Sequence, residues 1–243
     1  MEERIGEIER LSFWLQSRLS VCGLSGVRLA SPAELSANMR IAFNPGLRDV
    51  VMNAMLKGEQ PLRWSQAGPL DAEEHRNHYT HDQAASISWA WRDGPRSPVP
   101  ATVLAPLVNP GPYPKRLTLM WEPSDPGQSA GQLEREKTLM DAKRILLNQS
   151  PGNESQRQRL DREFAERAAQ EEAMGAGFGD LSMYLTVTVP HESLLDDAAL
   201  DIKTRASQAK VHLRRATCSH SAVFATGLGA GIHPGYKSFG GWF

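Results

Sequence analysis

The sequence predicts an α+β fold in which two βαβ units form a ferredoxin-like antiparallel sheet with an inserted charged helical hairpin, preceded by a small helical N-terminal lobe. Three observations support it. Apolar residues recur at helical intervals near the N-terminus, the hydrophobic period changes to two from about residue 85, and the order strand, helix, strand then occurs twice. The expected domains are residues 1–83 (helical lobe and linker), 84–226 (α+β domain with the hairpin insertion at 127–175) and 227–243 (flexible glycine-rich tail).

The N-terminal lobe is expected to consist of helices. Apolar residues at helical spacing predict a first helix over residues 3–20. Ser31-Pro32 is a helix start signal, and the apolar stripe that follows it stops at Asn44-Pro45. A further short helix is expected over residues 47–56, after which glycines and prolines punctuate a polar stretch that leads to the domain boundary.

The α+β domain begins with an alternating pattern. Ile87, Trp89 and Trp91 alternate with smaller or polar residues, as in a strand with one buried face. The later elements expected in order are a short helix within 99–108, a strand at 116–122, charged helices at 128–148 and 154–174 that pair as an antiparallel hairpin, a strand at 181–189, a long helix from Leu195 to Arg215 and a last strand at 217–226.

Composition excludes several classes of protein. The chain has 243 residues, a formal net charge of −1 and a sequence pI near 6.7, so a general polyanion binder is not expected. Two cysteines, Cys22 and Cys218, are too few for a disulfide-dense scaffold or a multi-cysteine metal site. No apolar run approaches the ~20 residues that span a bilayer, and the acidic, amphipathic start lacks the pattern of a signal peptide.

Three histidines, His75, His78 and His81, form an H-x2-H-x2-H pattern beside acidic residues. Imidazole and carboxylate groups suit Zn²⁺ and similar ions. On a helix, each step of three residues rotates the next ring by about 60° away from the preceding one. The pattern is therefore expected to be a solvated loop that enters the first strand. We expect no metal and no cofactor, and a small metal-dependent enzyme using this cluster is the alternative function.

Other motifs of enzymatic chemistry are absent or incomplete. The sequence contains neither G-x-x-x-x-G-K-[ST] nor G-x-S-x-G. Cys218 and His220 would share one face of the expected last strand, but no acidic residue is placed to orient the imidazole. Gly227, Gly229 and Gly231 precede no helix, unlike the glycines of a dinucleotide loop. We therefore expect no catalytic residue and no enzymatic activity.

Surfaces for protein contacts are expected on the helical hairpin and the first strand. The hairpin carries pairs of opposite charge at i, i+4, which is typical of solvated helix faces and fits a protein partner better than a nucleic acid. The tryptophans of the strand are expected to pack the sheet, and any exposed one is available to a partner. The candidate interface residues are Trp89, Trp91, Arg159, Arg162, Glu163, Glu166 and Arg167.

Four segments in order resemble one protein family. They are Gly26–Leu35 running into Met39–Pro45, Trp89–Arg92 followed by Leu104–Leu107, Arg116–Pro123, and Tyr184–Pro190 leading to Leu213–Arg215. Together they resemble the C-terminal soluble region of an actinobacterial membrane-protein family from conjugation-like, type IV secretion-related gene clusters. The similarity spans roughly residues 26–226. Part of it is also similar to the N-terminal, non-ATPase region of the secretion ATPases of such clusters.

The resemblance implies a non-enzymatic structural or assembly component of a conjugation or type IV secretion-like machinery, acting through protein–protein contacts at the cytoplasmic face of the membrane. It implies the secretion ATPase or other complex subunits as partners, self-association, and no small-molecule substrate. Family members usually begin with two transmembrane helices, so the full-length protein is expected to be membrane-anchored and this region soluble. A nucleic-acid-binding accessory protein is a further alternative, which suits conjugation but not the charge balance.

Overall fold

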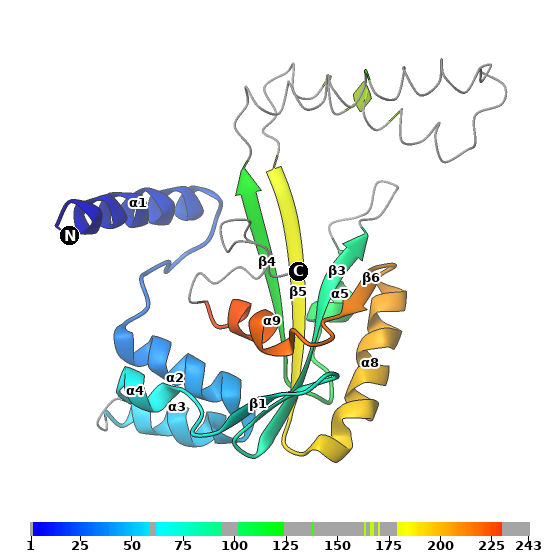
Figure 1. The fold of residues 1–243 in the computed structure, drawn as a ribbon. Helices are drawn as coiled ribbons and strands as arrows, with labels where there is room; N and C mark the ends of the chain where they lie inside the picture. Colours follow the sequence, from blue (N-terminus) through cyan, green and yellow to red (C-terminus); the bar gives the residue numbers. More distant parts are fainter. Residues whose placement is uncertain are drawn as a thin grey trace. The chain divides into compact units, whose positions relative to one another are not determined.

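A computed structural model (Figure 1) describes residues 2–58, 62–93, 102–123 and 179–229, and the single residues Thr138, Glu163, Glu166, Arg167 and Gln170. The chain divides into two compact units. Unit 1 comprises Met1–Ala72 and His81–Ala84, and unit 2 comprises Glu73–Thr80 and Ala85–Phe243. Each unit has buried side chains of its own.

Within the described residues, six strands form one sheet in the order β1-β2-β3-β5-β4, and β6 pairs with β3. The pairs β3/β5, β4/β5 and β3/β6 are antiparallel. The prediction of a mixed α+β fold with an antiparallel sheet is therefore confirmed. The strands are β1 (Ala72–Glu74), β2 (Tyr79–His81), β3 (Ala84–Asp93), β4 (Lys115–Pro123), β5 (Gly179–Val189) and β6 (His212–Arg215).

Two helical connections pack on the same face of the sheet in unit 2. The chain passes from β3 to β4 through α5 (Ala105–Val108), and from β5 to β6 through η2 (Glu192–Leu194) and α8 (Leu195–Gln208). Leu107 of α5 and Ile202 of α8 belong to one buried cluster with Ile87 and Leu185. Because side chains alternate along a strand, the odd-numbered apolar residues of β3 and β5 face these helices.

The opposite face of β3 and β5 is polar and is covered by α9 (His220–Thr226), which crosses in front of β4 and β5 in Figure 1. Ser86 and Thr188 share a hydrogen bond of 2.8 Å between their hydroxyl oxygens, and Ser88 and Thr186 share one of 2.9 Å. All four residues are buried. Because the hydroxyls pair across the two strands, each one regains the hydrogen bond to water that it loses on burial.

The strands β4 and β5 stay paired to their ends, where Pro123 lies opposite Gly179. A Cβ atom at Gly179 would lie 2.4 Å from the backbone oxygen of Glu122 and 2.7 Å from the ring of Trp121, so glycine is required there. The predicted hairpin lies between these strands and outside the described residues, except for the single residues Thr138, Glu163, Glu166, Arg167 and Gln170, which are helical.

The helices of unit 1 largely follow the expectations. The predicted helix over residues 3–20, the helix that starts after Ser31 and the helix over residues 47–56 are confirmed, whereas α4 was not predicted. The helices are α1 (Glu2–Val21), α2 (Pro32–Phe43), η1 (Pro45–Leu47), α3 (Arg48–Leu56) and α4 (Trp64–Ala67).

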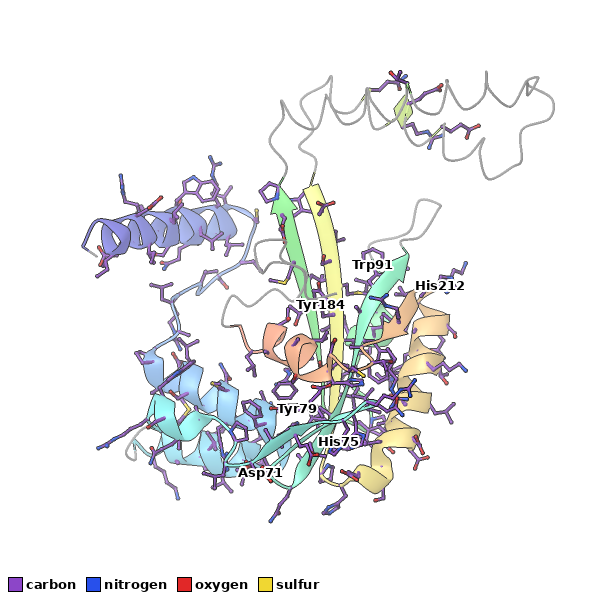
Figure 2. The ribbon with its side chains drawn as sticks, in the orientation of Figure 1. Asp71, His75, Tyr79, Trp91, Tyr184 and His212 are labelled. Carbon is purple, nitrogen blue, oxygen red and sulfur yellow. The ribbon has the colours of Figure 1, made fainter. Side chains whose placement is uncertain are left out.

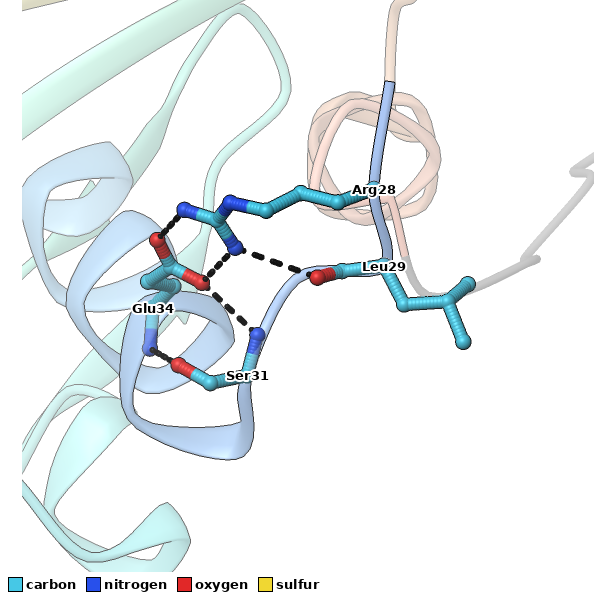
Figure 3. A network of polar contacts seen from close by, with 4 residues as sticks. All are labelled: Arg28, Leu29, Ser31 and Glu34. Atoms are coloured by element: carbon cyan, nitrogen blue, oxygen red, sulfur yellow. Dashed lines mark hydrogen bonds and ion pairs between the residues drawn. The ribbon is translucent and has the colours of Figure 1, made fainter. Parts of the chain in front are cut away.

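Reciprocal capping explains why α2 begins after Ser31 (Figure 3). The Ser31 hydroxyl accepts a hydrogen bond from the backbone N–H of Glu34 at 3.2 Å, and the Glu34 carboxylate accepts one from the Ser31 N–H at 2.7 Å. Arg28 donates to the same carboxylate and to the backbone oxygen of Leu29. The Arg28 guanidinium, with the two groups of Ser31, lowers the pKa of Glu34 to about 2.

The side chain of Asp82 holds the turn between β2 and β3 within unit 1. Asp82 has a φ of 52°, in the left-handed region that aspartate tolerates better than most residues. Its carboxylate accepts hydrogen bonds from the Leu70 N–H at 2.7 Å and from Arg40 Nη1 at 3.0 Å. These contacts hold the turn to α2 and to the chain before β1.

Two expectations for the end of unit 2 are wrong. The helix α8 ends at Gln208 instead of Arg215, since Lys210 has a φ of 52° and residues 212–215 pair with β3 as β6. The stretch 217–226, expected as a strand, contains the helix α9. Both errors have one cause. The residues that stabilise β6 and α9 lie in β3 and β1, far away in the sequence, and the local hydrophobic period does not indicate them.

Candidate functional site

The residues His75 and His78 flank the turn that joins β1 to β2. The His75 backbone N–H donates to the His78 backbone oxygen at 2.9 Å, which leaves Arg76 and Asn77 as the turn. Figure 2 labels His75 at this hairpin. Residues paired across a hairpin project to the same face, and the two imidazole rings stack with centroids 4.4 Å apart and planes inclined by 21°. A strand turn, and not a helix, brings these two histidines together.

The turn is anchored through both of its backbone oxygens. Arg215 of β6 donates from Nε and Nη2 to the backbone oxygen of Asn77, at 3.2 and 2.8 Å. The backbone N–H of Cys218 donates to the backbone oxygen of Arg76 at 3.0 Å. The histidine pair therefore stands on a fixed support made by residues far along the chain.

The carboxylate of Glu192 joins the two histidines to form a group of three potential metal ligands. Glu192, in η2, places Oε1 3.3 Å from Nε2 of His78. One ligand atom from each of His75, His78 and Glu192 lies within 4.8 Å of the other two. The two histidines are half-buried and the glutamate is exposed, so the group lies open to solvent on one side.

The tautomer of His75 follows from its neighbour Thr80. The Thr80 hydroxyl donates to the backbone oxygen of Glu73 at 3.3 Å, and it lies 3.1 Å from Nε2 of His75. Since its one proton is engaged, the hydroxyl accepts from Nε2–H of His75. That arrangement leaves the Nδ1 lone pair of His75 available as a ligand.

The third histidine of the sequence pattern lies elsewhere. His81 stands three residues after His78 on β2, and odd steps along a strand point to opposite faces. It is buried in unit 1, where its ring meets that of Phe43 edge to face at 5.4 Å. Glu192 takes the place that the sequence analysis gave to His81. It follows a strand-ending proline, and no pattern near residue 75 indicates it.

His220 forms a second polar arrangement, beneath α9. Its Nδ1 accepts a hydrogen bond from the backbone N–H of Ser88 at 3.0 Å. Burial lowers the pKa of His220 to about 4, so the ring is neutral at pH 7. Among the described residues, its buried Nε2 has no hydrogen-bond partner. Cys218 does not share a strand face with His220 as expected, because Cys218 is exposed in the turn before α9 with a φ of 59°.

Arg116 of β4 lies under the same helix. Its guanidinium carbon is 4.2 Å from the centroid of the Phe224 ring, a cation–π contact. In the part of the chain that the structure describes, its two terminal nitrogens are buried without a hydrogen-bond partner. Burial lowers the pKa of Arg116 to about 10, and the side chain stays charged at pH 7.

The candidate interface residues predicted from the sequence differ in their exposure to solvent. Trp89 is 8% exposed and belongs to the core, and Trp91 is half-buried against it. Arg159 and Arg162 lie outside the described residues. The hairpin residues that the structure describes, Glu163, Glu166 and Arg167, are exposed.

Several large apolar side chains are exposed on α1, for which the sequence had predicted only a helix. On α1, Phe13 is 76% exposed and Trp14 is 56% exposed. Helical spacing identified the helix but did not predict that its apolar side chains are exposed. The exposed large apolar residues of α1 are Ile5, Ile8, Leu11, Phe13, Trp14, Leu15 and Val21.

Comparisons of the chain with family models, curated proteins and solved structures give no match. Among the described residues, no helix combines the length and the apolar composition that crossing a bilayer requires.

Proposed function

We propose that the protein is a non-enzymatic structural or assembly component of a conjugation or type IV secretion-like machinery, acting through protein–protein contacts at the cytoplasmic face of the membrane. The observation that carries the proposal is the apolar surface of α1. Phe13 and Trp14 are large aromatic side chains that stand mostly in solvent. Such side chains contribute most of the binding energy when a partner buries them.

The charges of α1 favour a protein partner over a lipid surface or a nucleic acid. The helix carries four glutamates and three arginines. Helices that lie on anionic membranes have a polar face rich in lysine and arginine, and nucleic-acid binding needs a cationic surface. A mixed-charge rim around aromatic side chains is instead typical of a protein interface. The partner we propose is another subunit of the machinery, with the secretion ATPase first in order because of the sequence resemblance.

In this proposal, unit 2 is a ferredoxin-like unit. The support is the strand order β4-β5-β3-β6 with antiparallel neighbours. The connections through α5 and α8 both cover one face, as two split βαβ units require.

Photo-crosslinking in the source cell tests the function. A photoreactive amino acid replaces Trp14 in one variant and, in the control, Ser12, a partly exposed polar residue whose side chain lies on the opposite side of the same helix from that of Trp14. We expect an adduct from position 14, identified by mass spectrometry as a subunit of the secretion machinery, and little from position 12. Equal adducts at both positions, no adduct, or an adduct only with a lipid or a nucleic acid would contradict the proposal.

A further inference from the structure

We propose that His75, His78 and Glu192 bind one divalent transition-metal ion, for which Zn²⁺ is the best match. Two imidazole nitrogens and one carboxylate oxygen are donors that Zn²⁺ takes in proteins. This site is independent of the protein contacts proposed for α1. It differs from the sequence pattern that first drew attention to the histidines, because Glu192 replaces His81.

The distances already approach those of a metal site. Donor atoms at about 2.0–2.2 Å from a tetrahedral zinc ion lie about 3.4 Å from one another. His78 Nε2 and Glu192 Oε1 are 3.3 Å apart. Since the third donor lies within 4.8 Å of both, a small rotation of the His75 side chain closes the site.

The surrounding bonds prepare the site for an ion. Thr80 holds the His75 tautomer that leaves Nδ1 free, in the way that outer groups orient histidine ligands. Arg215 fixes the backbone on which both histidines stand. The turn therefore loses little conformational freedom when an ion binds, and more of the binding free energy remains as affinity.

The bound ion would join the β1–β2 turn to the start of α8. His78 and Glu192 are 114 positions apart in the sequence, so the ion closes a long loop, and such a link stabilises the folded chain. An ion that binds the folded state alone stabilises it by an amount that grows with the logarithm of the free ion concentration, and so raises the unfolding temperature. The role we infer is structural, holding the hairpin against the helix.

Calorimetric titration of the full chain with Zn²⁺, after chelator treatment, tests the site. We expect one ion per chain in the unmodified protein, and a loss of affinity of at least 10-fold in His78→Ala and Glu192→Gln. The controls are His191→Ala, next to the proposed ligand, and His212→Ala, another exposed histidine; both should bind as the unmodified protein does. Failure of the unmodified protein to bind one ion, or an equal loss in the controls, overturns the proposal.

The hydroxyl of Thr80 provides a second test that spares all three ligands. Thr80→Val removes the acceptor for His75 Nε2–H and should weaken Zn²⁺ binding about 10-fold, whereas Thr80→Ser keeps the hydroxyl and should restore it. The same pair decides the question if His78→Ala does not fold. Zn²⁺ should also raise the unfolding temperature of the unmodified protein and not that of Glu192→Gln. Equal affinities in the two Thr80 variants would show that His75 is not a ligand in the inferred tautomer.

Discussion

The Glu74 carboxylate accepts the backbone N–H of His220 at 2.8 Å, across 146 positions of sequence. Its second oxygen accepts the N–H of Ser221 at 2.6 Å. The first N–H groups of a helix lack partners within the helix, and a negative charge there is favourable. One side chain of β1 thus satisfies the start of α9, the helix that covers the polar face of the sheet.

Removal of this cap should destabilise unit 2. Glu74→Ala leaves two N–H groups at the start of α9 without their charged acceptor, and we expect the free energy of unfolding to fall by about 1–3 kcal/mol. Urea unfolding measures it. The matched control is Glu73→Ala in chelator-containing buffer, because Glu73 is exposed and accepts no helix N–H; it should change stability by less than about 0.5 kcal/mol. Equal effects of the two changes would refute the cap.

The buried ring of His220 predicts a loss of stability in acid. Its pKa is about 4 in the folded chain against an ordinary 6.5, so the unfolded chain takes up a proton more readily. The stabilisation is complete above pH 6.5 and is lost as the pH falls towards 4, by up to about 3 kcal/mol. In His220→Asn, the amide oxygen takes over the acceptor role of Nδ1 without titrating. Unfolding free energies measured from pH 7.5 to 4 should fall less in this variant, and parallel curves would contradict the assignment.

A buried leucine and an exposed leucine of unit 2 form a matched pair for mutation. Leu185 is 0% exposed, between β3 and β4, whereas Leu200 on α8 is 63% exposed. Leu185→Ala should lower the free energy of unfolding by about 2–5 kcal/mol, because it removes buried methyl groups and leaves a cavity. Leu200→Ala is the same chemical change and should cost less than about 0.5 kcal/mol. Chemical denaturation of both variants checks the orientation of β5 and α8.

Arg116 should be replaceable by an apolar residue of similar length. Its terminal nitrogens are buried with no acceptor among the described residues, which costs about 1–3 kcal/mol of desolvation. Arg116→Met keeps the packing of the stem on Phe224 and removes the charge, so we expect unchanged or increased stability by thermal unfolding. A clear loss of stability would mean that a negatively charged group, from the rest of the chain or a ligand, pairs with Arg116.

The parts of the fold that the sequence predicts are those whose cause is local. The alternation around Ile87 identified β3, and the Ser31 cap identified the start of α2. Residues 212–226 were assigned wrongly because β6 exists by pairing with β3, and α9 starts where Glu74 provides its cap. A hydrophobic period carries no information about either partner.

For the same reason, the sequence predicted only the two histidines of the candidate site and not Glu192. His75 and His78 stand close in the sequence and in space, since a two-residue turn separates them. Glu192 lies 114 positions from His78 and meets it only in the folded chain, and no sequence signal near Glu192 predicts that contact. His81 was grouped with them by spacing, whereas the alternation of side chains along β2 places it on the other face.

The pairing of Pro123 with Gly179 has an evolutionary consequence. Because β4 and β5 meet at this pair, everything encoded between codons 124 and 178 enters and leaves the sheet at neighbouring points. Insertions, deletions or whole exchanged segments at this position leave the strand register untouched. The connection between β4 and β5 is therefore a position where recombination can exchange a whole segment of the chain and keep the same sheet.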